Sequence, residues 1–393
     1  MKKICLSFLL AFLLVLESGA SVKIGSLYYN LNSSKKTAEV APYQGDKYEG
    51  DVSIPAEVSY QGTTYRVTAV AENAFWDCGG LTSIVLPAGL KSIGPSAFLA
   101  CTQLTSLKIP ASVVSIGDVA FCFEGALTSI EVDENNTVYD SRNRCNALIE
   151  TASNTLITGC VNTVIPNTVT SLADYAFHGC VLLKSITIPS SVKRIGRAAF
   201  STCPKLESIN MPNSMEQIGG HAFEYCQSLK QLQIPEGVQV IEEYLCIYSE
   251  SLESVTIPST ANVVEDNPFP AEVKDIYCFA PVPPKSKWGY TITIQPYVEA
   301  GEKYVFPATL HVPATSVEAY KNCNDGWQEF RSIVPLTSKE VGIQDREFER
   351  GSNLSTQWYS IDGQAVTGRP TSNGIFIRKG ADGTVKKYYM KRN

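Results

Sequence analysis

The chain has 393 residues, a formal net charge of −6 and a hydrophobic content of 44%. This mildly acidic balance excludes the basic patch that nucleic-acid binding requires, so we expect no nucleic-acid partner. The hydrophobic content is sufficient for an extended core.

The first 20 residues are typical of a secretory signal peptide. Lys2 and Lys3 form a positive start, Ile4–Leu16 is an apolar run, and small residues precede a cut before Ser21. The run is shorter than the roughly 20 residues that a membrane-spanning helix needs. We therefore predict cleavage, export and no membrane span in the mature chain.

Residues 21–60 predict an N-terminal cap, and a 23-residue repeat follows in residues 61–336. One row of equivalent positions holds Phe75, Phe98, Phe121, Phe177, Phe200 and Phe223. A second row holds Cys78, Cys101, Cys180, Cys203 and Cys226. Two further rows hold leucine and proline. Equivalent positions are 23 residues apart except for one step of 56, and the cysteine row lacks a cysteine at position 124 just before it. A unit this short cannot bury its own apolar face, so successive units must stack.

A single repeat shows how the coil is built. Ile84 and Leu86 alternate with small or outward-facing residues, which predicts a short strand that Pro87 ends. Gly94 is expected where the chain turns, and Phe98 returns to the core. The sequence therefore predicts a mainly-β solenoid with parallel stacked strands, capped at both ends, plus a small C-terminal β unit.

The cysteines divide into two groups. Five share one row of the repeat, where stacked coils about 4.8 Å apart would bury them as a ladder of small hydrophobic side chains. Cys145 and Cys160 lie in the irregular stretch between Leu127 and Leu183 and are the better disulfide candidates in an exported protein.

Outward strand positions form a candidate protein-binding face. One row holds Lys108, Glu131, Thr187, Asn210, Gln233 and Thr256. A second row, at the strand entrance, alternates in charge and holds Lys184, Glu207, Lys230 and Glu253. These ten residues are called the strand face below. Either they are a solvated surface with cross-strand ion pairs of about 0.2–1 kcal/mol each, or they form a recognition surface.

The 56-residue step contains Asp133, Asn135, Thr137 and Asp140, spaced loosely like a calcium loop. The stretch has no glycine at the turn and no closing glutamate, so we expect no metal there. Two strand-like runs, 147–150 and 155–158, predict an irregular coil that still joins the stack.

The C-terminal third departs from the period. Residues 276–278 and 310–313 predict two further core strands, and Thr315 with Glu318 fits a helix capping box. This helix and Trp327 would cover the end of the core. Residues 337–356 predict a linker, and residues 357–393 a separate small β unit.

The chemistry of an enzyme is not evident in the sequence. His178, His221 and His311 have no partners at metal-ligand spacing, and we expect no catalytic residues, metal or cofactor. Glycan binding would need exposed aromatic rings. The candidates for it are Tyr28, Tyr29, Tyr60, Tyr65, Trp76, Tyr277, Trp288 and Tyr290.

The pattern L-x-S-I-x-I-P…I-G…A-F-x-x-C, clearest at Leu183–Cys203 and Leu206–Cys226, resembles the BspA-like leucine-rich repeat family of bacterial exported proteins. The resemblance covers roughly residues 50–336 and implies a leucine-rich repeat fold. It also implies cell-surface display, adhesion and the binding of extracellular or host surface proteins. Glycan binding or nutrient capture at the surface is the alternative.

The tail is similar to C-terminal segments that direct export and surface attachment in Gram-negative bacteria with a type IX secretion system. The matching features are Tyr359-x-Ile361-x-Gly363, Gly374–Ile377 and a basic finish. This resemblance implies a sorting role and an outer-surface location.

Overall fold

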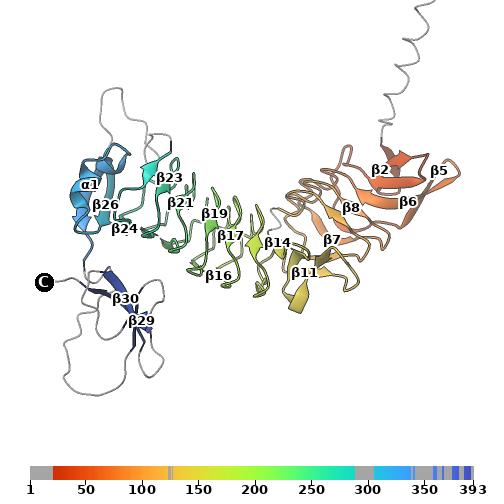
Figure 1. Cartoon of the computed structure of the whole chain (residues 1–393). Coiled ribbons are helices and arrows are strands. Elements are labelled where there is room, and N and C mark those ends of the chain that lie inside the picture. The colour runs from red at the N-terminus through yellow and green to blue at the C-terminus, as the bar shows by residue number, and fades with distance from the viewer. Residues whose placement is uncertain are drawn as a thin grey trace, which may run out of the picture.

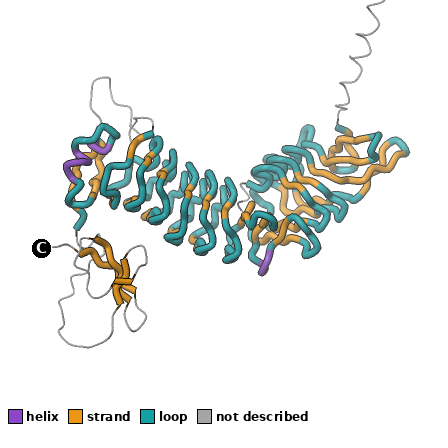
Figure 2. The backbone as a smooth tube through the Cα atoms, viewed as in Figure 1, coloured by secondary structure: helices purple, strands orange, loops and turns teal. Residues whose placement is uncertain are grey.

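The computed structural model describes residues 21–122, 125, 127–287, 305–337 and 340, together with four strands between residues 357 and 390. The predicted signal peptide and almost all of the predicted linker lie outside the described residues. Coils follow one another along an elongated body in which short strands alternate with turns (Figures 1 and 2).

An irregular insertion separates two groups of coils. The first stack holds β3 (Thr37–Val40), β4 (Gly50–Ser53), β5 (Glu57–Tyr60), β6 (Thr63–Val70), β7 (Leu81–Val85), β8 (Ser92–Ile93), β9 (Ser106–Ile109), β10 (Ser115–Ile116) and β11 (Ser129–Val132). It is preceded by β1 (Val22–Ile24) and β2 (Leu27–Asn32). The insertion holds β12 (Tyr139–Asp140), η1 (Arg142–Arg144) and β13 (Ala147–Glu150).

The second stack begins at β14 (Thr155–Gly159) and continues through a series of short strands. They are β15 (Ser171–Leu172), β16 (Ser185–Thr187), β17 (Arg194–Ile195), β18 (Ser208–Asn210), β19 (Gln217–Ile218), β20 (Gln231–Gln233), β21 (Val240–Ile241), β22 (Ser254–Ile257), β23 (Val263–Val264), β24 (Asp275–Cys278) and β25 (Lys285–Ser286). The last coils carry β26 (Phe306–Val312), α1 (Val317–Lys321), η2 (Trp327–Glu329) and β27 (Phe330–Pro335).

Two strand ladders join successive coils in parallel and confirm the predicted solenoid. The longer strands pair in the 23-residue register, for example Ile186 with Ile209, and the shorter strands do the same, for example Ile195 with Ile218. Parallel pairing already begins with strands of the segment 21–60, since β3 pairs with β6 and β4 with β7.

A third ladder joins the turns that carry the phenylalanine row. The Phe75 N–H donates to the Ala97 carbonyl at 2.8 Å, and the Phe200 N–H donates to the Ala222 carbonyl at 2.9 Å. The N–H two residues earlier makes the same kind of bond to the next coil, as from Ser96 to Asp118 at 3.0 Å. Every N–H of this ladder therefore points toward the C-terminal end of the stack.

The predicted rows of core residues are buried. Neighbouring phenylalanine rings stack at 5.0–5.8 Å, as between Phe75 and Phe98 or Phe200 and Phe223. The cysteines are free thiols, and the Sγ atoms of Cys101 and Cys203 each donate to a carbonyl of the preceding coil at 3.2 Å. The buried ladder is confirmed, although Cys180 is only partly buried.

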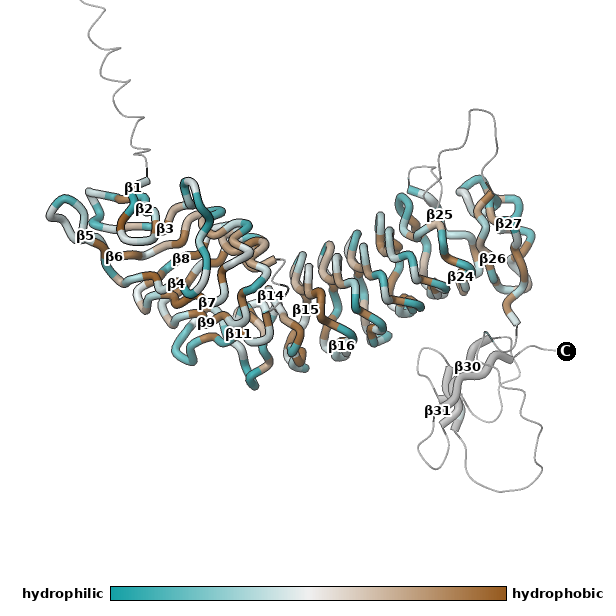
Figure 3. The backbone as a smooth tube through the Cα atoms, turned by 180° about the vertical axis from the view of Figure 1, so that it is seen from behind, coloured by the Kyte–Doolittle hydropathy of each residue, from teal (hydrophilic) through white to brown (hydrophobic). Residues whose placement is uncertain are grey.

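Strand β13 divides the hydrophobic core in two. Ala147 and Ile149 belong to the core of the second stack, whereas Leu148 belongs to the core of the first. Alternate side chains of one strand thus face opposite stacks. Figure 3 shows hydrophobic residues recurring along the coils of both stacks, and Figure 1 shows a bend between the stacks.

The division explains why the two disulfide candidates of the irregular stretch, Cys145 and Cys160, are not bonded to each other. Cys145 packs in the core of the second stack and Cys160 in the core of the first, and both are free. The Cys160 thiol instead donates to the Asn146 carbonyl at 3.4 Å. The prediction that the irregular coil joins the stack is confirmed on one side, because β14 pairs in parallel with β15.

The predicted helix and Trp327 cover the C-terminal end of the core, as expected. Tyr320 and Trp327 are fully buried, and the Trp327 Nε1–H donates to the Pro284 carbonyl at 2.8 Å. The capping box is wrong. Ser316 precedes the helix without a side-chain cap, and its hydroxyl donates to the Pro281 carbonyl at 2.7 Å.

The tail contains an antiparallel sheet in the order β29-β28-β30-β31. Its strands are β28 (Gln357–Ser360), β29 (Ala365–Val366), β30 (Gly374–Lys379) and β31 (Val385–Met390).

Ser249 occupies the cysteine row and provides a test of the ladder. Its buried hydroxyl donates to the Phe223 carbonyl at 2.8 Å and accepts from the Cys226 N–H at 3.0 Å. We expect Ser249→Ala to cost about 1–3 kcal/mol, because it leaves two buried polar groups unpaired. Ser249→Cys should cost less, since thiols make the carbonyl bond in neighbouring coils. Urea unfolding measures both, and equal losses would contradict this account.

Candidate functional site

The strand face lies at the molecular surface, as the alternation of apolar and polar residues predicted. All ten side chains are exposed except that of Thr256, which is half-buried. Thr187 lies opposite Asn210, and Gln233 opposite Thr256, on adjacent parallel strands. The face is therefore a regular array of polar side chains with one row for each strand position.

The charged row does not form the expected ion pairs. The Glu207 N–H donates to the Lys184 carbonyl at 2.8 Å, so the backbones are in register. Among the described residues, however, Lys184, Glu207 and Lys230 form no ion pair within 4.0 Å. Glu253 pairs instead with Lys274 of the next coil at 3.0 Å, and this hydrogen bond lowers the pKa of Glu253. Three charges of the row thus remain available to a partner.

The face is interrupted by the insertion. Lys108 and Glu131 pair across β9 and β11 at 3.1 Å, with both side chains more than 60% exposed. Strand β11 has no parallel partner beyond it, and the next longer strands, β16 and β18, form a separate sheet. The predicted residues therefore form two patches, one on each stack, instead of one continuous surface.

His311 lies at the C-terminal end of the outward row, in register with Tyr277. Its Nε2 is 3.0 Å from Asp275 Oδ1, its Nδ1 is 3.1 Å from Glu340 Oε1, and its ring packs on Tyr277. Sequence spacing did not indicate these partners, because the coils here have lost the 23-residue period. The arrangement orients the imidazole between two carboxylates.

The aromatic candidates for glycan binding are mostly used in packing. Tyr29 and Tyr65 are buried, Tyr28, Tyr60 and Tyr277 are half-buried, and Trp76 is 48% exposed. Trp288 and Tyr290 lie outside the described residues. An exposed pair that was not predicted is Tyr225 with Tyr248, whose rings stack at 4.8 Å and 19° with 41% and 44% exposure. The 23-residue spacing of this pair was a usable signal.

The calcium-like stretch uses its oxygens internally. Asp133 Oδ1 accepts the Asn135 N–H at 3.0 Å, and Asp140 accepts two bonds from the Arg142 guanidinium. Across the described residues, no group of three histidine, cysteine or acidic side chains is arranged to hold a metal ion. Within the same residues, no helix has the length and apolar character to cross a membrane.

The stacked parallel coils, phenylalanine row and cysteine row define a bacterial-type leucine-rich repeat solenoid. A family model described as the BspA type leucine rich repeat region matches six copies over residues 68–158 and 152–274, more than half of the chain. The chain belongs to this family. No curated protein matches it in sequence.

Solved structures match the chain at low sequence identity. The pneumococcal vaccine antigen PcpA is 17% identical with a TM-score of 0.51, over 81% of this chain and 99% of that chain. A leucine-rich repeat protein from Bacteroides ovatus is 23% identical with a TM-score of 0.42, over 80% and 76%. A leucine rich cell surface protein from Faecalibacterium prausnitzii is 23% identical with a TM-score of 0.37, over 66% and 95%.

His178 predicts a measurable pH dependence of stability. Burial lowers its pKa from 6.5 to about 4. In the unfolded chain the His178 imidazole therefore takes up a proton below about pH 6.5, whereas in the folded chain it does so only near pH 4. Stability is fully present above pH 6.5 and falls as the pH drops, by about 2 kcal/mol at pH 5.

Chemical unfolding of wild type and His178→Gln at pH 7.5 and pH 5 checks this expectation. Glutamine does not titrate in this range, so the variant should lose less stability than wild type between the two values. Equal losses in the two proteins would show that the His178 ring does not carry the effect.

Proposed function

We propose that this chain is an exported, non-enzymatic surface protein that binds extracellular or host surface proteins through the strand face. The observation that carries the proposal is the array of exposed polar side chains in register on parallel strands. Lys184, Glu207 and Lys230 support it, because they have no ion-pair partner among the described residues. Such charges can steer a partner and fix its register.

Export and surface display rest on the first 20 residues, on the similarity of the tail to sorting segments, and on the family. The relative from Faecalibacterium prausnitzii is itself described as a cell surface protein. Intact-mass measurement of the protein from the outer-surface fraction of its organism tests this part. A mature N-terminus at Ser21 is expected, and full-length protein in the cytoplasm would contradict it.

The face is tested by a matched pair of variants. The face variant carries Thr187→Arg, Asn210→Arg and Gln233→Arg. The control carries Thr170→Arg, Gln217→Arg and Gln239→Arg, at the start of the short strands β15, β19 and β21 or one residue before them. All six positions are exposed. On a panel of purified extracellular proteins, the face variant should bind at least about tenfold more weakly, because bulky cations break a packed contact.

The control should retain wild-type affinity for the same proteins. Unchanged binding by the face variant, or loss only in the control, would place the binding surface elsewhere. Both variants exchange neutral for positive residues, so a difference between them cannot come from net charge.

A second candidate function, glycan binding, is favoured by the exposed Tyr225–Tyr248 pair. Parallel aromatic rings separated by one coil offer apolar edges and outer faces against which a sugar ring can pack. A glycan array that compares wild type with Tyr225→Ala/Tyr248→Ala separates the candidates. Glycan signals that vanish in this variant would support the second function.

A further inference from the structure

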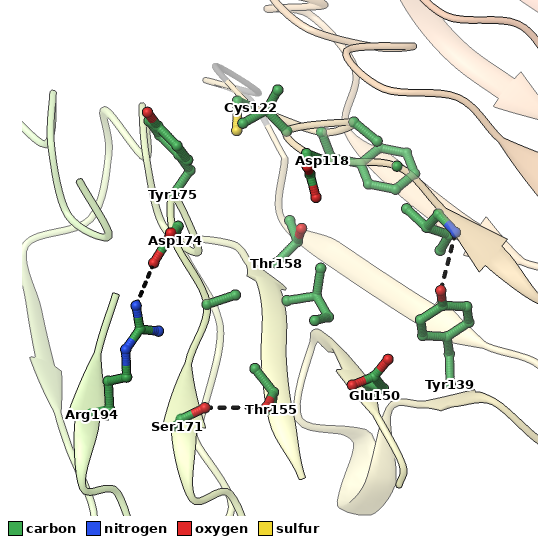
Figure 4. A pocket seen from close by; sticks show the side chains of 17 residues that line it. Asp118, Cys122, Tyr139, Glu150, Thr155, Thr158, Ser171, Asp174, Tyr175 and Arg194 are labelled. Atoms are coloured by element: carbon green, nitrogen blue, oxygen red, sulfur yellow. Dashed lines mark hydrogen bonds and ion pairs between the residues drawn. The ribbon is translucent and has the colours of Figure 1, made fainter. Parts of the chain in front are cut away.

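A cleft of about 540 Å³ lies between the two stacks. One wall is the last coil of the first stack, around Asp118 and Cys122, and the other is formed by β14 and the coil around Asp174 (Figure 4). Its lining comes from the shorter strands and the phenylalanine turns, so the cleft does not include the strand face. The volume falls within the range of small-ligand sites.

The first wall carries unpaired backbone donors. In each other turn, the first N–H of the ladder donates to a carbonyl of the next coil. The residues with this N–H are Asn73, Ser96, Tyr175, Ala198, His221 and Tyr244. The second N–H of the ladder also donates to the next coil. It belongs to Phe75, Phe98, Phe177, Phe200, Phe223 and Cys246. The equivalent N–H groups of Val119 and Phe121 donate to no described residue. The insertion has removed the coil that would accept from them.

The opposite wall carries the matching acceptor. In other coils, the carbonyl that receives the first ladder bond accepts it from an N–H of the preceding coil. These carbonyls belong to Pro95, Asp118, Arg197, Gly220, Glu243 and Asp266. The Asp174 carbonyl accepts from no described N–H. The interrupted ladder therefore ends in donors on one wall of the cleft and begins again with an acceptor on the other.

The donor wall is also conformationally strained. Val119 has a φ of +50°, the left-handed conformation found at this position in Ser96 and Ala198. A β-branched residue is disfavoured there. In other coils the ladder bond to the next coil helps to hold this backbone, whereas at Val119 that bond is missing.

The cleft has an excess of negative charge. Asp118 and Glu150 line it, and Asp174 is neutralised by Arg194 at 2.9 Å. Neither Asp118 nor Glu150 forms an ion pair with a described residue. Tyr139, which also lines the cleft, accepts the Ile116 N–H at 3.0 Å and so caps the neighbouring strand edge. A ligand that fits must offer carbonyl oxygens to one wall, an N–H to the other and a cation to the carboxylates.

We propose that the cleft binds an extended peptide segment carrying lysine or arginine. Its backbone would supply the missing rung of the turn ladder, as peptides do when they add to an exposed sheet edge. Its basic side chain would lie against Asp118 and Glu150. The site is independent of the strand face, so either can fail without the other.

The probes are two pools of acetylated and amidated hexapeptides, with lysine or glutamate fixed at the central positions. Ligand-observed NMR with the full-length mature protein should show binding of the lysine pool only. Asp118→Asn/Glu150→Gln should weaken it at least about fivefold, because two charge contacts are removed. Glu57→Gln/Glu72→Gln makes the same charge change at exposed sites outside the cleft and should bind as wild type.

Binding should also slow hydrogen exchange at the Val119 and Phe121 amides, an effect that simple charge attraction would not produce. Three results would overturn the proposal. They are failure of both pools to bind, equal binding by wild type and Asp118→Asn/Glu150→Gln, and lysine-pool binding without protection of these two amides. Unfolding curves that match wild type establish that the variants fold.

Discussion

Hydrogen bonding between successive coils is the constraint on which the rest of this structure depends. A coil of 23 residues encloses too few apolar side chains to be stable alone, so each is held by its neighbours. Backbone ladders between neighbouring coils fix the register within each stack. That register places phenylalanine on phenylalanine, thiol beneath carbonyl, and polar side chain beside polar side chain.

The same constraint explains why one interruption has consequences on every side of the molecule. The hairpin of β13 and β14 restores pairing toward the second stack but not toward the first. As a result the core divides at Leu148, the strand face divides between Glu131 and Thr187, and the turn ladder ends at Val119 and Phe121. The regular part of the chain presents a repeated surface, and the irregular part presents a single concave one.

The 23-residue period was sufficient to predict the coil, the buried rows and the outward rows, because those depend only on equivalent positions. It could not predict contacts between positions that are not equivalent. The pairing of His311 with Asp275 and Glu340, and the separation of Cys145 from Cys160, depend on how irregular segments fold. Side-chain geometry also escaped prediction, since the alternating charges of Lys184 and Glu207 suggested an ion pair that does not form.

The reason for glycine in the repeat is visible only in the structure. Gly94 was expected at a turn, but a Cβ there would lie 2.5 Å from the Glu72 backbone nitrogen. At Gly196 the corresponding distance to the Asp174 nitrogen is 2.4 Å. These residues are small because adjacent coils approach closely, which is a property of the stack and not of one coil.

Residue-resolved hydrogen exchange of the native protein, measured by NMR, tests the interrupted ladder most directly. The amides of Ser96 and Phe98 bond to the next coil and should be strongly protected, because exchange there requires coils to separate. The amides of Val119 and Phe121 occupy equivalent positions without that bond and should exchange much faster. Equal protection at all four positions would contradict the account of two stacks joined across an open ladder.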